Sequence, residues 1–125
     1  MSLGSDLYSL LITNAAVAAL VGTGVYPNML PQEPAYPACT YFCVDAVPLI
    51  NQDGDGLLDH GRWQVSCWAT TYAGAVALAT AVRAAMRGWR AAYGVPAQFA
   101  GWNDVPQPET GVYQRAVDFM IWHRE

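Results

Sequence analysis

The sequence contains no lysine, and charged residues of either sign are few. Six arginines stand against ten acidic residues, which gives a net charge of -4. General nucleic-acid binding needs a positive surface that displaces counterions from the phosphates. We therefore expect no nucleic-acid partner that is bound by charge or by sequence, and no attraction to an anionic membrane surface.

Long apolar runs are also missing. The longest, from Ala15 to Gly22, is less than half of the ~18 residues that a membrane span requires. No basic region precedes the first hydrophobic segment, so a secretory signal is not expected either. These absences predict a protein that works in the cytoplasm.

Cysteine is scarce, and the number of cysteines is odd. Cys39 and Cys43 lie four residues apart on an expected strand, where about 3.3 Å per residue separates them by about 13 Å. A disulfide needs Cα atoms within about 7 Å, so only Cys67 could pair with one of them, across strands. We expect three reduced and mostly buried thiols.

Apolar and aromatic side chains are plentiful. Hydrophobic residues make up 54% of the chain, and it carries five tryptophans and seven tyrosines. This content is sufficient for a real core in a chain of this length. Aromatic side chains are also favoured at protein interfaces, which points towards a protein with partners. We expect a single domain over residues 1–125.

Periodicity predicts two helices and four strands. The helices are expected at 5–21 and 72–87, and the strands at 38–47, 62–70, 95–102 and 112–123. Four prolines exclude a helix or a central strand at residues 25–37, which should form an extended connection. Residues 48–61 are predicted to form a long hairpin loop. Residues 88–96 either extend the second helix or connect it to the next strand. The order helix-strand-strand-helix-strand-strand predicts an α+β fold, in which two helices pack on one face of a four-stranded, mostly antiparallel sheet.

The hairpin loop begins like a calcium-binding loop. Its potential ligands are Asn51, Asp53, Asp55 and Asp59, with Gly56 at the sixth position. The twelfth position should be a bidentate glutamate, but here it is the cation Arg62. Asp and Gly are also the residues that a polar turn favours. We therefore expect no tight calcium site and prefer a polar hairpin loop.

The same loop has features of a partner-binding element. Loops longer than about 12 residues are uncommon unless they are functional or disordered. This one combines acidic with aliphatic residues, and the interface candidates are Leu49, Ile50, Asp53, Asp55, Leu57 and Leu58. We favour an element that becomes ordered on a partner over a loop folded back on its own domain.

Arg83, Arg87 and Arg90 recur at helical spacing and share one face of the second helix. The simpler interpretation is the solvated side of that helix. The alternative is a basic stripe that meets an acidic neighbouring subunit or lines a DNA passage.

No catalytic or metal-binding motif is present. His60 and His123 are the only histidines, and neither has the spacing of a zinc site. Ser66-Cys67 lies within a strand without a nucleophile elbow. Paired carboxylates at Asp45 and Asp118 stay open, but no other residue supports an enzyme. We expect a protein without catalytic activity and without cofactors.

Several stretches together resemble the tail completion, or tail terminator, proteins of tailed phages, prophages and gene transfer agents. They are Leu7-Tyr8, Leu10-Leu11, residues 15–22, Val25-Tyr26-Pro27, Pro37, Thr40-Tyr41, residues 62–72, Val82-Arg83-Ala84, Asp118-Phe119 and residues 122–125. The most specific is 62–72, a strand that runs into an Ala-rich helix. The resemblance implies a homo-oligomeric ring, often a hexamer, at the head-proximal end of a tail tube.

Such a ring would halt tube polymerisation and offer a surface to the head-tail connector. Its partners would be itself, the tail tube protein and the connector. It would assemble in the host bacterial cytoplasm and end in the virion tail. The alternatives are a small protein- or calcium-binding module that uses the 51–59 loop, and an enzyme with an unfamiliar site.

Overall fold

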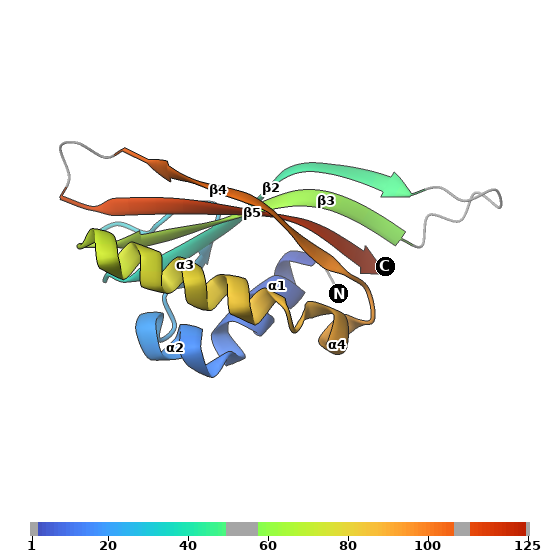
Figure 1. The fold of residues 1–125 in the computed structure, drawn as a ribbon, viewed down its shortest axis with the longest axis horizontal. Coiled ribbons are helices and arrows are strands. Elements are labelled where there is room, and N and C mark those ends of the chain that lie inside the picture. Colours follow the sequence, from blue (N-terminus) through green and yellow to red (C-terminus); the bar gives the residue numbers. More distant parts are fainter. Residues whose placement is uncertain (1–2, 50–57, 107–110, 125) are drawn as a thin grey trace.

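The computed structural model describes residues 3–49, 58–106 and 111–124 (Figure 1). The helices are α1 (Leu3–Thr13), α2 (Ala15–Val21), α3 (Tyr72–Met86) and α4 (Trp89–Tyr93). The strands are β1 (Val25–Pro27), β2 (Ala38–Leu49), β3 (Leu58–Ala69), β4 (Ala97–Val105) and β5 (Tyr113–Arg124).

The strands form one sheet in the order β1-β2-β3-β5-β4. Every pairing is antiparallel except that between β1 and β2. All the helices lie on one face of this sheet (Figure 1). The expected α+β class, the mostly antiparallel sheet and the one-sided helical layer are confirmed. The predicted numbers of four strands and two helices were too low, because the described residues form five strands and four helices.

The predicted first helix is two helices that meet at Asn14. The Asn14 backbone is extended, with φ −72° and ψ 124°, and its side-chain oxygen accepts hydrogen bonds from the amides of Ala16 and Val17. This is an N-cap, which satisfies amides that the first turn of a helix leaves unpaired. It lets Leu11 of α1 and Val17 of α2 both reach the core across the bend.

No single described helix is long and apolar enough to cross a membrane. α1 and α2 would reach the required length and composition only as a pair, and that pair is bent by 82°.

The short strand β1 was not predicted, because it lies inside the proline-rich connection. It pairs in parallel with β2 at the edge of the sheet, with Val25 opposite Cys39. An edge position tolerates Pro27, since one side of such a strand needs no ladder hydrogen bonds.

The β2–β3 hairpin is longer than predicted. β2 continues to Leu49 and β3 begins at Leu58, and these two residues pair directly. The expected loop at 48–61 was therefore too long at both ends, and only residues 50–57 lie outside the described part. Pairing with β5 extends β3 here, with Leu58 opposite Arg124, because a third strand supports what turn-like residues alone would not.

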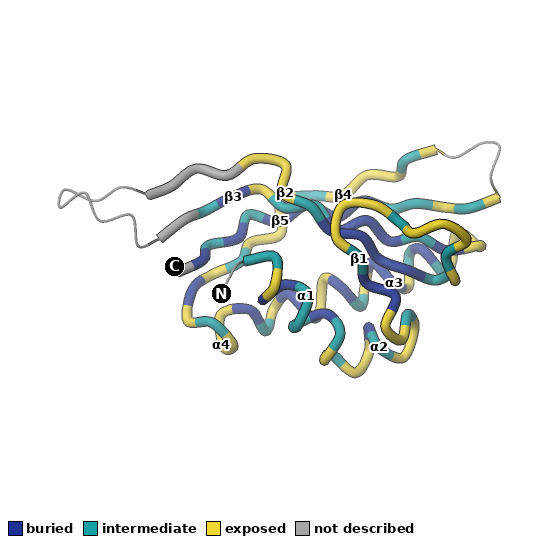
Figure 2. Tube along the Cα trace, turned by 180° about the vertical axis from the view of Figure 1, so that it is seen from behind, coloured by how far each residue is buried: buried dark blue, intermediate teal, exposed yellow. Residues whose placement is uncertain are grey.

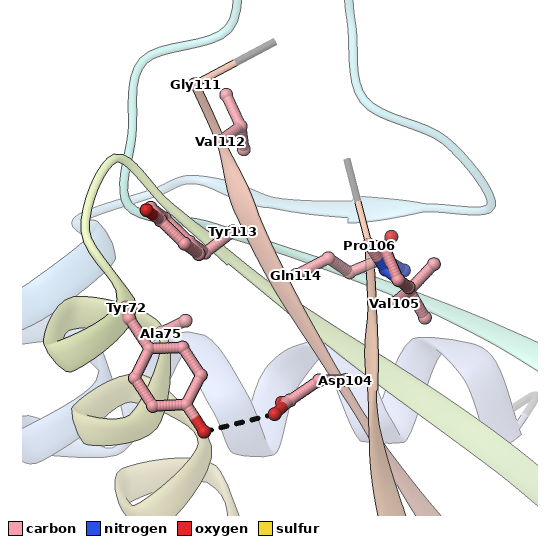
Figure 3. A pocket seen from close by; sticks show the side chains of 9 residues that line it. All are labelled: Tyr72, Ala75, Asp104, Val105, Pro106, Gly111, Val112, Tyr113 and Gln114. Atoms are coloured by element: carbon pink, nitrogen blue, oxygen red, sulfur yellow. Dashed lines mark hydrogen bonds between the residues drawn. The ribbon is translucent and has the colours of Figure 1, made fainter. Parts of the chain in front are cut away.

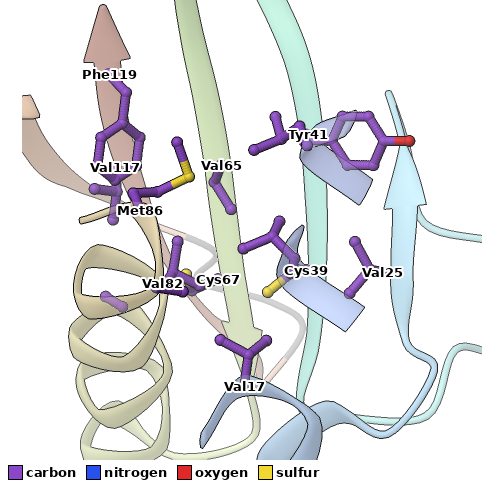
Figure 4. Packing of buried hydrophobic residues seen from close by; sticks show 14 of the residues in the cluster. Val17, Val25, Cys39, Tyr41, Val65, Cys67, Val82, Met86, Val117 and Phe119 are labelled. Carbon is purple, nitrogen blue, oxygen red and sulfur yellow. The ribbon is translucent and has the colours of Figure 1, made fainter. Parts of the chain in front are cut away.

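The core lies between the sheet and the helices (Figure 4). Its largest fully buried side chains are Trp89, Phe119, Leu7, Leu11, Leu78 and Ile121. Trp89 belongs to α4, which continues the chain after a break at Gly88, and its indole N–H donates to the carbonyl of Trp122 at 3.1 Å. α4 thus anchors the end of the helical layer to the end of β5.

The three cysteines are free and mostly buried, as expected. Cys39 and Cys67 are buried and face each other across β2 and β3, whereas Cys43 is exposed. The hydrogen bond with Cys39, together with burial, raises the pKa of Cys67.

Candidate interaction surfaces

A groove runs between α3 and the edge strand β4. The helices pack mainly on β1, β2, β3 and β5, so β4 extends beyond the helical layer. Much of β4 is exposed along its length (Figure 2). The groove therefore follows from the sheet being wider than the layer that covers it.

Three hollows follow one another along α3 and make up this α3–β4 groove. The first, of about 420 Å³, lies between Tyr72, Asp104 and Tyr113 at the start of α3 (Figure 3). The residues that line the other two are Ala79, Thr80, Arg83, Met86, Arg87, Ala97, Phe99, Trp102, Arg115, Val117 and Phe119. The groove thus combines aromatic rings with three arginines.

Arg115 joins both walls of the groove. Its guanidinium lies 3.9 Å from the centre of the Trp102 ring, donates to Asp104 Oδ1 at 2.8 Å, and donates to the Tyr72 hydroxyl at 2.7 Å. The Tyr72 hydroxyl donates in turn to Asp104 Oδ2 at 3.1 Å (Figure 3). The hydrogen bond from Arg115 lowers the pKa of Asp104, so this carboxylate stays charged at neutral pH. The network holds Trp102 in place although 53% of it is exposed.

Arg83 occupies the middle of the groove. Its guanidinium lies 3.8 Å from the centre of the Phe99 ring, which is close enough for a cation–π interaction. Phe99 meets the buried Phe119 edge to face, with centroids 6.0 Å apart. The exposed cation is therefore connected to the core through two aromatic rings.

Only two of the three arginines of the predicted stripe lie along the groove. Arg83 and Arg87 line the groove, whereas Arg90 lies on the separate helix α4, because α3 ends at Met86. All three side chains are exposed, and none of them forms an ion pair with a described carboxylate.

The predicted loop residues fall into two groups. Leu49 and Leu58 pair in the strands, and Asp59 is in β3 opposite Pro48, so these three are not loop residues. The other interface and calcium candidates, namely Ile50, Asn51, Asp53, Asp55 and Leu57, lie outside the described residues. Within the described part of the chain, no three metal-ligating side chains gather.

Comparison with known proteins decides the family. The sequence matches the family of the tail completion protein gp17 over residues 5–124. The chain belongs to this family. It is a structural component of a phage tail, and the expectation of a structural protein instead of an enzyme is confirmed.

A solved structure supports the fold. A chain in a structure titled "Virion of native gene transfer agent (GTA) particle" superposes with a TM-score of 0.78 at 20% sequence identity. The alignment covers 99% of this chain and 96% of that one. No curated protein sequence matches the chain.

In this tail completion protein, several polar side chains outside the groove contact other elements of the fold. His123 Nε2 lies 2.9 Å from Asp6 Oδ2 in the interior and links α1 to β5. The Asp118 carboxylate accepts hydrogen bonds from Arg62 at 2.7 Å and Gln64 at 3.0 Å. His60 stacks on a tryptophan ring. These contacts join elements of the fold.

The sequence of this tail completion protein did not predict the part of the groove that contains aromatic rings. Trp102 and Asp104 were assigned to a strand and a turn, with no reason to place them beside Arg115. One signal was available, since Tyr113, Arg115, Val117 and Phe119 alternate along one strand. That alternation puts Arg115 on the core-facing side, where a cation needs a partner.

Proposed function

We propose that this protein forms a homo-oligomeric ring, a hexamer by expectation, at the head-proximal end of the tail tube. The ring stops polymerisation of the tube and presents an attachment surface to the head-tail connector. It assembles in the host bacterial cytoplasm and becomes part of the virion tail. Membership of the tail completion family and the fold shared with a chain of a virion particle support this assignment.

The observation that carries the ring is the difference between the two edges of the sheet. One edge is β4, and the other is β2, of which β1 covers only the stretch from Cys39 to Tyr41. Beyond that stretch Val44 is 49% exposed. Head-to-tail contacts join two different surfaces, and they close into a ring when the rotation between subunits fits. Two unlike edges on opposite sides of the subunit meet this requirement.

Assembly with the cognate tube protein tests the proposal. The protein is added to polymerising tube protein, and the products are examined by negative-stain microscopy and native mass spectrometry. We expect rings alone or at tube ends, and shorter tubes as the amount of added protein rises. A protein that stays monomeric and leaves tube lengths unchanged in the presence of tube protein would contradict the assignment.

A further inference from the structure

The α3–β4 groove is basic in an acidic chain. Three of the six arginines line it, namely Arg83, Arg87 and Arg115, whereas Asp104 is its only lining acid among the described residues. Arg115 already has Asp104 and Tyr72 as partners. Arg83 and Arg87 therefore remain available to an incoming anion.

The groove also offers apolar area that a purely ionic ligand would not use. Trp102 is half exposed, and Phe99, which is 38% exposed, lines the same hollow. An occupant with acidic and aliphatic side chains would satisfy both properties, because burial of its aliphatic groups adds to the charge attraction.

This chain carries one such segment. Residues 49–59 read Leu-Ile-Asn-Gln-Asp-Gly-Asp-Gly-Leu-Leu-Asp, with three acids, four aliphatic residues and no cation. Residues 50–57 form its central part, the acidic tip. The tip joins β2 and β3, whose ends lie farther out than any helix (Figure 1).

The spacing of the charges matches as well. Arg83 and Arg87 are one helical turn apart, which is about 6 Å along the axis at 1.5 Å per residue. Asp53 and Asp55 are two residues apart, which is about 6.6 Å in an extended chain. Two parallel ion pairs can therefore form at once.

We propose that the acidic tip of one subunit binds in the α3–β4 groove of the next subunit. Within one subunit the groove follows β5 and the edge strand β4, whereas the acidic tip is carried by the neighbouring β2–β3 hairpin. A contact from the hairpin to a neighbour's groove is head-to-tail and repeats around a ring. The inference rests on the proposed ring and specifies its interface.

Charge exchange tests the contact. Arg83→Glu/Arg87→Glu places acids in the groove, and Asp53→Arg/Asp55→Arg places cations on the tip. Each double variant should reduce assembly at least tenfold in the presence of tube protein, measured as the protein concentration that half-maximally caps tubes. The control is Arg90→Glu, which reverses one arginine charge on α4 outside the groove and should assemble like the wild type. The single variant Arg87→Glu makes the same charge change inside the groove and should weaken assembly.

Mixing decides between neighbouring and internal contacts. In an equimolar mixture of the two double variants, an alternating ring pairs every tip with a groove of opposite charge, so assembly should return. Circular dichroism and thermal melting of each variant confirm folding.

If both double variants cap tubes as well as the wild type does, the groove contact is overturned but the ring remains. Rescue in the quadruple variant without rescue in the mixture also overturns it, since the tip would then bind its own subunit. Absence of capping by the wild type itself would instead refute the proposed function.

Discussion

The break at Asn14 offers a sharp test of the structure, because the two possible helical arrangements predict opposite signs for one substitution. Asn14→Ala removes the side-chain oxygen that accepts two backbone hydrogen bonds of 3.1 Å each at the start of α2. Loss of an N-cap costs about 1 kcal/mol of the free energy of unfolding. For a chain of this size that corresponds to about 3–5 °C in Tm.

A continuous helix would give the reverse result. Asn14 would then be an interior helical residue, and replacing it by alanine would stabilise the protein by about 0.5 kcal/mol. Urea denaturation followed by far-ultraviolet circular dichroism measures both the stability and the helical signal. The matched control is Asn14→Asp, which keeps an oxygen acceptor and should stay within about 0.5 kcal/mol of the wild type. A more stable Asn14→Ala variant with a stronger helical signal would refute the two-helix arrangement and the packing derived from it.

Three further predictions concern buried and paired groups. Maleimide should label Cys43 alone in the native protein and should reach Cys39 and Cys67 only in denaturant, as mass spectrometry of the products would show; rapid native labelling of all three would contradict the core. Trp89→Phe should lower the free energy of unfolding by about 2 kcal/mol in urea titrations, since it removes a buried indole hydrogen bond and leaves a carbonyl unpaired. Asp104 has a pKa lowered by a hydrogen bond from its arginine partner, so its contribution to stability is present above about pH 4 and is lost as the pH falls through the lower folded pKa. The Tm difference between the wild type and Asp104→Asn should therefore shrink on acidification, and a difference that grows would contradict the ion pair.

The elements with a strong local pattern were predictable. The Ala-rich helix expected at 72–87 is α3 (Tyr72–Met86), and the strand expected at 112–123 is β5 (Tyr113–Arg124). Each agrees within one residue, because hydrophobic periodicity and local propensity point to the same structure there. The break in the first predicted helix also had a signal in the sequence. Asn14 lies three residues after Leu11, so a continuous helix would place it in the apolar stripe.

Other parts depend on contacts that are distant in sequence. The end of the hairpin is a strand only because β5 lies beside β3, so local turn residues gave a loop that was too long. The groove depends on the pairing of β4 with β5, whose register shifts between Phe99 and Gly101. A one-residue shift changes which side chains share a face, so no pattern within β4 could place Trp102 beside Arg115. Arg83 and Arg87 were identified from the sequence, but Arg115 and the aromatic rings of the groove were not.

The position of β5 has a consequence for the order in which the chain can fold. β5 follows every other strand in sequence, yet it lies between β3 and β4 in the sheet. During synthesis β4 therefore has no strand to pair with, and one edge of β3 stays unpaired, until β5 has left the ribosome. Contacts between residues far apart in sequence also form slowly. The sheet should close in one late step, and variants that end before β5 should aggregate through their unpaired strands instead of accumulating as a stable partial fold.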